Sequence, residues 1–180
     1  MVRYNPYAGE PEPEEITLEE YAESWLDMAP HVEQIKALAS QVKTVVEFGL
    51  RGGVSTWAFL DGLPADGTLL GVDIDAGALI SKRVRNDPRF TFLVGDSILV
   101  DLPKKADLVM IDSSHEYDQT VAELVVAEKM KPRFIVLHDY LYPQSWCQVR
   151  QAVDGFVAFR SYKIDVVHHS EWGLAVLVPK

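Results

Sequence analysis

Acids and histidines follow the short apolar runs of this sequence. Five such runs lie between residues 44 and 138, and each carries a carboxylate or an imidazole at or next to its end. Unbroken apolar runs of this kind are typical of strands in a parallel sheet covered by helices on both faces. The carboxyl ends of such strands meet along one edge, where several acids repel one another unless a ligand or a cation lies among them. The pattern predicts a site for hydrogen bonding, metal binding or proton transfer at Glu47, Asp73, Asp96, Asp112 with His115, and His138 with Asp139.

A glycine-rich turn, Gly49-Leu50-Arg51-Gly52-Gly53, follows the first run and leads into a helix-like segment. Glycines let backbone approach a ligand closely, and the amides of a helix N-terminus bind carboxylate or phosphate. The turn lacks the G-x-G-x-x-G spacing of dinucleotide sites, because Arg51 stands where the second glycine would be. Glu47 before the turn disfavours a pyrophosphate and favours a ligand with ammonium or sulfonium charge, such as S-adenosylmethionine. A dinucleotide stays the weaker alternative.

The acids of the second and third runs suit the nucleoside part of such a ligand. Asp73 ends the second run about twenty residues after the turn, where a carboxylate accepts hydrogen bonds from ribose hydroxyls, and Asp75 is the second candidate. Asp96 is placed to accept from an adenine amino group. Ser55, near the helix start, is placed to donate to a ligand carboxylate.

The elements that must position these residues alternate between strand and helix. Strands are predicted over residues 44–48, 68–73, 90–94, 107–111 and 133–138, and helices over residues 54–60, 76–85, 118–130 and 145–156. Two further strands, 160–168 and 172–178, are too close for a parallel crossover, which needs a dozen or more residues. They must form an antiparallel hairpin at the sheet edge. The predicted architecture is a doubly wound α/β fold.

Two helices are predicted before the sheet. Thr17 and Glu20 match a capping box that opens a helix with apolar positions as far as Ala29, Pro30 ends it, and a second helix leads to Lys43. We expect residues 16–43 to cover the pocket as lid helices. Residues 1–15 combine prolines with acids and are expected to form a flexible acidic arm, while residues 16–180 form a single domain.

Composition narrows the class of protein. The formal net charge of -10 disfavours nucleic-acid binding, which usually needs a basic face. Cys147 is the only cysteine, so neither an intramolecular disulfide nor a cysteine-rich zinc site can form. No apolar run is long enough to span a membrane, and the first residues lack the order of a secretory signal. We therefore expect a cytoplasmic protein without nucleic-acid or membrane partners, and homo-oligomerisation stays open.

The chain resembles the class I S-adenosylmethionine-dependent methyltransferases over about residues 44–178. The resemblance is carried by Glu47-Phe48-Gly49-Leu50-Arg51-Gly52-Gly53-Val54-Ser55, Gly71-Val72-Asp73, Gly95-Asp96 and the closing hairpin. It implies a Rossmann-like seven-stranded sheet that is mostly parallel, with an antiparallel last strand. The predicted donor-binding residues are Glu47, Gly49, Arg51, Gly53, Ser55, Asp73, Ile74, Asp96, Ser97 and Asp112.

Two further segments, Ile111-Asp112-Ser113-Ser114-His115-Glu116-Tyr117 and Val136-Leu137-His138-Asp139-Tyr140, resemble the divalent-metal-dependent O-methyltransferases of the catechol and antibiotic-sugar types. The resemblance implies that Asp112 and Asp139 bind the metal and that His115 is the general base, as in the sugar type, whereas the catechol type has Lys. His138 departs from the family, which has a carboxylate there. An imidazole suits Mn, Fe or Zn better than Mg, so the metal, Mg or Mn, and the need for it stay open. His138 could instead orient Asp139 or act as a second base.

The acceptor is expected to be a hydroxyl on a small molecule or a glycan sugar. Tyr140, Tyr142 and Trp146 follow the last parallel strand, and aromatic faces suit a planar ring or a sugar. The chain lacks the Asn/Asp-Pro-Pro-aromatic signature of amino-group methylation. The predicted enzyme is an O-methyltransferase with His115 and Asp112 as catalytic residues, with or without metal. The alternatives are a non-catalytic S-adenosylmethionine-binding or interaction protein and, least favoured, an NAD-dependent oxidoreductase.

Overall fold

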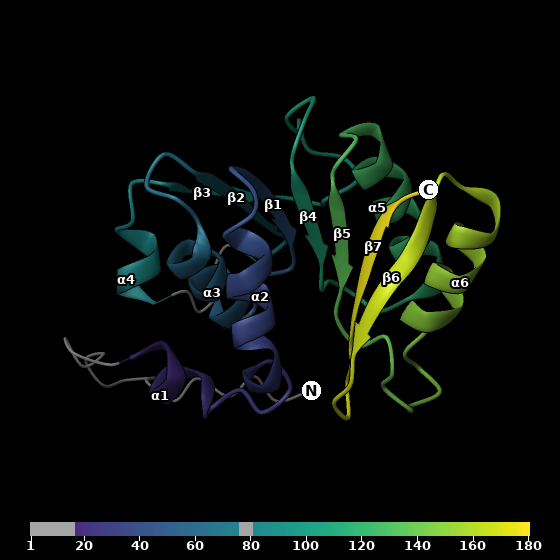
Figure 1. Ribbon diagram of the computed structural model, residues 1–180, viewed down its shortest axis with the longest axis horizontal. Coiled ribbons are helices and arrows are strands. Elements are labelled where there is room, and N and C mark those ends of the chain that lie inside the picture. Colours follow the sequence, from purple (N-terminus) through teal and green to yellow (C-terminus); the bar gives the residue numbers. More distant parts are fainter. Residues whose placement is uncertain (1–16, 76–80) are drawn as a thin grey trace.

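A seven-stranded sheet forms the centre of the protein, with helices on both faces (Figure 1). The computed structural model describes residues 17–75 and 81–180. The strand order is β3-β2-β1-β4-β5-β7-β6; the first five strands in the chain run parallel, and β7 runs antiparallel to β5 and β6. The predicted doubly wound α/β fold with a closing hairpin is confirmed.

The strands match the predicted runs to within two residues at each end. They are β1 Thr44–Phe48, β2 Thr68–Asp73, β3 Phe90–Val94, β4 Leu108–Ile111, β5 Phe134–Leu137, β6 Tyr162–His168 and β7 Leu174–Pro179. The central strands β4 and β5 are buried along their whole length. This burial explains why they read as unbroken apolar runs rather than as alternating patterns.

The helices of the described residues are α1 Leu18–Ala22, the 3-10 helix η1 Ala29–His31, α2 Val32–Ala39, α3 Val54–Gly62, α4 Lys82–Arg85, α5 Tyr117–Lys129 and α6 Val149–Phe159. The first part of the helix predicted over 76–85 lies outside the described residues, as does the predicted acidic arm. Helix α6 begins later than predicted, because the Gln148 backbone N–H donates to the His115 carbonyl instead of joining a helix.

The prediction of one helix from Thr17 to Ala29 is wrong beyond Ala22. The capping box between Thr17 and Glu20 is present, but the helix ends after five residues. Two contacts take the place of further helical turns. The Trp25 side chain is buried against the glycine turn, and the Asp27 carboxylate accepts a hydrogen bond from the Met28 N–H at 3.1 Å. A side chain that binds nearby backbone in this way competes with the helix.

Two hydrophobic layers lie on opposite faces of the sheet. One layer packs α1, α2 and α3 against the sheet, and the other packs α5 and α6 (Figure 1). Within the described residues, no helix is long and apolar enough to cross a membrane.

The strand order reverses between β1 and β4, which are neighbours although β2 and β3 lie between them in the chain. Open α/β sheets bind ligands in the crevice beyond the strand ends at such a point. Here the turn after β1 approaches the loop after β4 so closely that a Cβ atom on Gly49 would lie 2.2 Å from the Asp112 carbonyl oxygen. Gly49 also has a φ of 80°, which disfavours other residues.

Candidate active site

Asp73 fixes the glycine turn at the end of β1. Its Oδ2 atom accepts hydrogen bonds from the backbone N–H groups of Leu50 at 2.8 Å and Arg51 at 3.3 Å, and its Oδ1 atom accepts from Asp75 N–H. Arg51 itself has a φ of 45°, an uncommon conformation for a residue with a side chain. A carboxylate has about four acceptor positions, so Asp73 can hold the turn and still accept from a ribose hydroxyl.

Glu47 is fully buried beneath the turn. Burial raises its pKa from 4.5 to about 8, and the Ser55 hydroxyl, which donates to the Oε1 atom of Glu47, offsets only part of this effect. The Oε2 atom is buried without a hydrogen-bond partner among the described residues. Ser55 thereby links the buried Glu47 to the start of α3.

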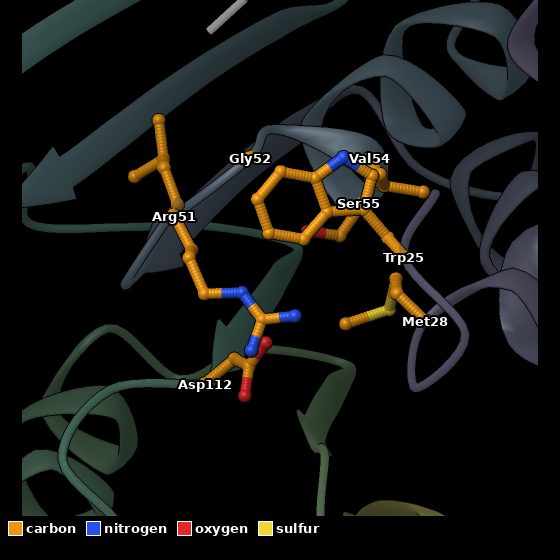
Figure 2. A pocket seen from close by; sticks show the side chains of 8 residues that line it. Trp25, Met28, Arg51, Gly52, Val54, Ser55 and Asp112 are labelled. Atoms are coloured by element: carbon orange, nitrogen blue, oxygen red, sulfur yellow. The ribbon is translucent and has the colours of Figure 1, made fainter. Parts of the chain in front are cut away.

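A pocket lies between the turn and the N-terminal segment (Figure 2). Its lining comprises Trp25, Met28, Leu50, Arg51, Gly52, Val54, Ser55 and Asp112. Figure 2 shows Arg51 extending from the turn in the direction of Asp112, with Trp25 and Met28 on the other side. A cation, a hydroxyl and a carboxylate between apolar walls match the charged amino and carboxylate groups of an amino acid.

The loop after β3 carries the residues predicted to meet adenine. The Oδ1 atom of Asp96 accepts from Ile98 N–H at 3.0 Å, and Ile74, which follows β2, is 77% exposed. Ser97 is buried, and its hydroxyl donates to Glu123 of α5. The hydrogen bond between Ser97 and Glu123 thus fixes the loop on α5, while Asp96 remains at the crevice.

Glu123 was not predicted from the sequence. It is fully buried and accepts hydrogen bonds from Ser97 of the β3 loop and, at 2.6 Å, from Ser113 of the β4 loop. Burial raises its pKa, and the hydrogen bonds from Ser113 and Ser97 act in the opposite direction. The available signal was its position on the same helix face as the buried Thr120 and Ala127, where a carboxylate needs partners.

Four of the predicted residues meet at the ends of β4 and β5. The Nε2 atom of His115 lies 2.7 Å from Oδ2 of Asp139 and 3.3 Å from Oδ1 of Asp112. The Nδ1 atom of His138 lies 3.3 Å from the same two oxygens. Burial would raise the pKa values of Asp112 and Asp139, but the two imidazoles lower both, and they hold that of Asp112 well below the ordinary value. We call Asp112, His115, His138 and Asp139 the rim cluster.

His138 fits a metal ligand by its hydrogen bonding. Its Nε2 atom lies 3.0 Å from the Asp27 backbone carbonyl, which can only accept, so Nε2 carries a proton. Burial would lower the pKa of His138, but Asp112 and Asp139 raise it well above 6.5, so the protonated ring also directs an N–H from Nδ1 to the carboxylates; a bound cation would take the place of that proton. One ligand atom each from Asp112, His138 and Asp139 lies within 4.8 Å of the others. Metal-bound histidines commonly donate their second N–H to a carbonyl in this way.

His115 is held by both carboxylates of the rim cluster. Burial would lower its pKa, but the hydrogen bonds to Asp112 and Asp139 raise it to about 9. The backbone is strained at the same place, since His115 has a φ of 62° and Asp139 a φ of 60°. Non-glycine residues with positive φ cluster at active sites, where the surrounding structure maintains the strain.

Aromatic rings extend from the rim cluster along one side. The ring of Trp146 lies 5.9 Å from that of His115 and 5.4 Å from that of Tyr142, which stacks on Trp172 at 6.4 Å. Tyr140 is not part of this surface, because it is buried and its hydroxyl donates to Asp154 at 2.8 Å. Trp172, in the loop before β7, was not predicted to belong to this aromatic surface.

The Cys147 thiol donates to the Asp139 carbonyl at 3.6 Å, and burial raises its pKa, as expected of a packed thiol.

His31 is buried beside the rim cluster. Its ring packs edge-on against His138 at 5.5 Å, and its Nε2 atom lies 2.9 Å from the Ser170 hydroxyl. Burial lowers its pKa to about 4, which keeps it neutral next to His138. The role of His31 is therefore packing and support of the cluster.

Comparisons with known proteins agree with this arrangement. Residues 46–140, more than half of the chain, match the Methyltransferase domain family. A search of the curated proteins finds no match.

Solved structures with similar folds include three described as O-methyltransferases. A candidate O-methyltransferase from Klebsiella pneumoniae is 23% identical, with 93% of this chain and 91% of that chain covered and a TM-score of 0.67. The Bacillus cereus O-methyltransferase in complex with SAH is 18% identical, with 93% and 92% covered and a TM-score of 0.69. TomG from Streptomyces achromogenes, in complex with SAM, is 16% identical, with 93% and 91% covered and a TM-score of 0.70. The chain belongs to the Methyltransferase domain family and has the Rossmann-like fold of class I S-adenosylmethionine-dependent methyltransferases.

Proposed function

We propose that this methyltransferase transfers the methyl group of S-adenosylmethionine to a hydroxyl oxygen, with His115 as the base and a divalent cation held nearby. One observation carries the proposal. Asp112 lines the donor pocket and also contacts His115 and His138 of the rim cluster. The groups that would hold the donor, the cation and the departing proton therefore share a single carboxylate.

The donor would lie along the turn and the adjacent strand ends. Asp73 would accept from the ribose hydroxyls, Asp96 from the adenine amino group, and Asp112 from the donor ammonium. Ile74 and Ser97 would flank the adenine. Gly49 and Gly53 supply positive-φ turns with φ of 80° and 71°, and Glu47 supports Ser55 from beneath.

Asp112, Asp139 and His138 would hold the cation. A bound cation lowers the pKa of an acceptor hydroxyl and orients it. The ligand set of one imidazole and two carboxylates suits Mn, Fe or Zn better than Mg, which prefers oxygen ligands alone.

His115 would take the acceptor proton. The acceptor oxygen forms a bond to the methyl carbon, the bond between that carbon and sulfur breaks, and the hydroxyl proton passes to the imidazole. General base catalysis of this kind contributes roughly 100-fold to 10,000-fold. A cation at Asp112 and Asp139 would compete for the carboxylate oxygens that hold His115, and this competition would free the imidazole for proton transfer.

The acceptor would approach along the aromatic side of the cluster. Trp146 is 46% exposed and lies next to His115, and a shallow groove beside it is lined by Glu116, Asp118, Gln148 and other polar residues. Carboxylates without a neighbouring cation in that lining favour a neutral, hydroxyl-rich acceptor over an anionic one.

We also propose that residues 16–43 act as a lid, since Trp25 and Met28 from this segment line the donor pocket.

The test is methyl transfer to a panel of phenols, catechols and free or glycosidic sugars, with and without a chelator. We expect turnover by the wild type, loss of at least 100-fold in His115→Ala, and no change in the exposed His169→Ala control. Undiminished turnover by His115→Ala would contradict the base assignment, and undiminished turnover with chelator would contradict the cation. Binding of S-adenosylhomocysteine without transfer to any acceptor would instead support a non-catalytic binding protein.

A further inference from the structure

Arg51 is the one positively charged side chain among the described residues that line the donor pocket. It stands within the glycine turn, at the point where a nucleotide-binding turn often has another glycine. A cation there has a specific use in a pocket for an amino acid group, because the guanidinium binds a carboxylate with two parallel hydrogen bonds.

Arg51 is held by the N-terminal segment. Its Nη2 atom forms an ion pair with Oδ2 of Asp27, and its guanidinium carbon lies 4.8 Å from the centre of the Trp25 ring. Trp25 in turn is fixed against the turn, since a Cβ atom on Gly52 would lie 2.3 Å from its ring. The side chain of Arg51 is 46% exposed and that of Asp27 is 19% exposed, so the ion pair sits at the edge of the pocket.

A donor carboxylate has few other partners in this pocket. The Ser55 hydroxyl donates to Glu47, and Asp112 would repel a carboxylate while attracting the ammonium. The other hydrogen-bond donors are the guanidinium of Arg51, the buried indole N–H of Trp25 and the first backbone amides of α3, which begins after Gly53 without a side-chain cap. Of these, the guanidinium alone carries a charge. The guanidinium is already bound to a carboxylate of the same chemistry as the ligand's.

We propose that Arg51 exchanges partners when the donor binds, so that the donor carboxylate replaces the carboxylate of Asp27. Asp27 then acts as an internal competitor that keeps Arg51 in place while the pocket is empty. This inference rests on the proposed use of S-adenosylmethionine, and it adds the residue that recognises the carboxylate and the residue that opposes its binding.

The experiment is titration calorimetry on the full chain with two ligands that differ in the group concerned. S-adenosylhomocysteine carries the amino and carboxylate groups, and 5′-methylthioadenosine lacks both. We expect Arg51→Gln to weaken the binding of S-adenosylhomocysteine roughly 10-fold to 100-fold, as for loss of a hydrogen bond to a charged group. The affinity for 5′-methylthioadenosine should stay unchanged. We expect Asp27→Asn to strengthen the binding of S-adenosylhomocysteine roughly 3-fold to 10-fold, because a half-exposed ion pair competes only modestly.

A matched control is Arg133→Gln. Arg133 is also exposed and lies over an aromatic ring, that of Phe134 at 4.7 Å, but it is outside the pocket lining. Its substitution is expected to change neither affinity. Urea unfolding of each variant distinguishes altered binding from altered folding.

Three results would overturn the exchange. Unchanged S-adenosylhomocysteine affinity in Arg51→Gln would assign the carboxylate to the α3 amides. Equal weakening of both ligands would mean that Arg51 only maintains the pocket. Weaker S-adenosylhomocysteine binding in Asp27→Asn would make Asp27 a supporting residue rather than a competitor. A wild type that binds neither ligand would overturn the proposed function as well, whereas the first three results leave it standing.

Discussion

Asp112 and Asp139 are both carboxylates of the rim cluster, but they face different neighbours. Asp112 lines the pocket beside the glycine turn and contacts both imidazoles, whereas Asp139 contacts the imidazoles and is absent from the pocket lining. The two residues should therefore separate donor binding from cation binding.

We expect Asp112→Asn to weaken the binding of both S-adenosylhomocysteine and Mn²⁺. Asp139→Asn should weaken the binding of Mn²⁺ alone. Loss of one carboxylate from three ligands should reduce Mn²⁺ affinity at least 10-fold, since even the supporting partners of metal ligands are worth that much. Calorimetric titration of each variant with each ligand measures both effects. Equal loss of S-adenosylhomocysteine affinity in the two variants would show that the sites are not divided in this way.

Glu47 makes stability depend on pH. Its pKa is raised from 4.5 to about 8 by burial, so between these values the folded chain holds a proton that the unfolded chain has released. Its contribution to stability is fully present below pH 4.5 and is lost as pH rises towards 8. We expect Glu47→Gln to remove this loss, and the difference in unfolding free energy between variant and wild type to change by on the order of 3 kcal/mol from pH 5 to pH 8. Urea unfolding measures this difference. A difference in unfolding free energy that stays constant from pH 5 to pH 8 would refute the assignment.

The residues of the rim cluster could be predicted because they follow strands directly, and strand ends converge whatever packs around them. Asp27 and Trp172 could not be predicted in this way. Both lie in loops whose approach to the sheet depends on tertiary contacts, namely the hydrogen bond from His138 to the Asp27 carbonyl and the stacking of Trp172 on Tyr142. The roles of the predicted donor residues remain predictions until a ligand is bound.

Helix α5 connects the two halves of the crevice through Glu123. One buried carboxylate accepts hydrogen bonds from the loop after β3, which carries Asp96, and from the loop after β4, which carries Asp112 and His115 of the rim cluster. The helix thereby fixes the distance between the two loops. Its effect on function would be one of positioning, since Glu123 is buried away from solvent.

We expect Glu123→Ala to destabilise the fold by about 1–3 kcal/mol, because the Ser97 and Ser113 hydroxyls lose a buried acceptor. Urea unfolding measures the change. Glu128→Ala on the same helix is the control; its ion pair with Arg160 is partly exposed and should contribute at most about 1 kcal/mol. A Glu123→Ala variant as stable as the wild type would show that the network does not hold the loops.

The strands could be predicted more reliably than the N-terminal helices. Strands β4 and β5 lie at the centre of the sheet, where burial on both faces imposes an unbroken apolar run. The segment after α1 also carries apolar residues at helical spacing, but Trp25 and Met28 face the glycine turn rather than a neighbouring helix. Periodicity alone does not distinguish these two uses of an apolar side chain.

The predicted site residues lie along the sheet edge at which the strand order reverses between β1 and β4. The antiparallel hairpin could be predicted from the short loop between its strands, and its place in the sheet from family resemblance. The insertion of β7 between β5 and β6 brings the loop before β7 against the loop after β5, where Leu141 N–H donates to the Trp172 carbonyl at 2.7 Å. The aromatic side of the crevice is therefore a product of sheet topology.

The most direct test of the central claim is to follow the methyl group itself. The wild-type chain would be incubated with S-adenosylmethionine labelled with ¹³C in the methyl group, Mn²⁺ and the hydroxylated acceptor panel, and the product would be examined by NMR. We expect the label in an O-methyl ether, with one S-adenosylhomocysteine released for each ether formed. Label on nitrogen or carbon, or no transfer by a chain that binds S-adenosylhomocysteine, would contradict the account.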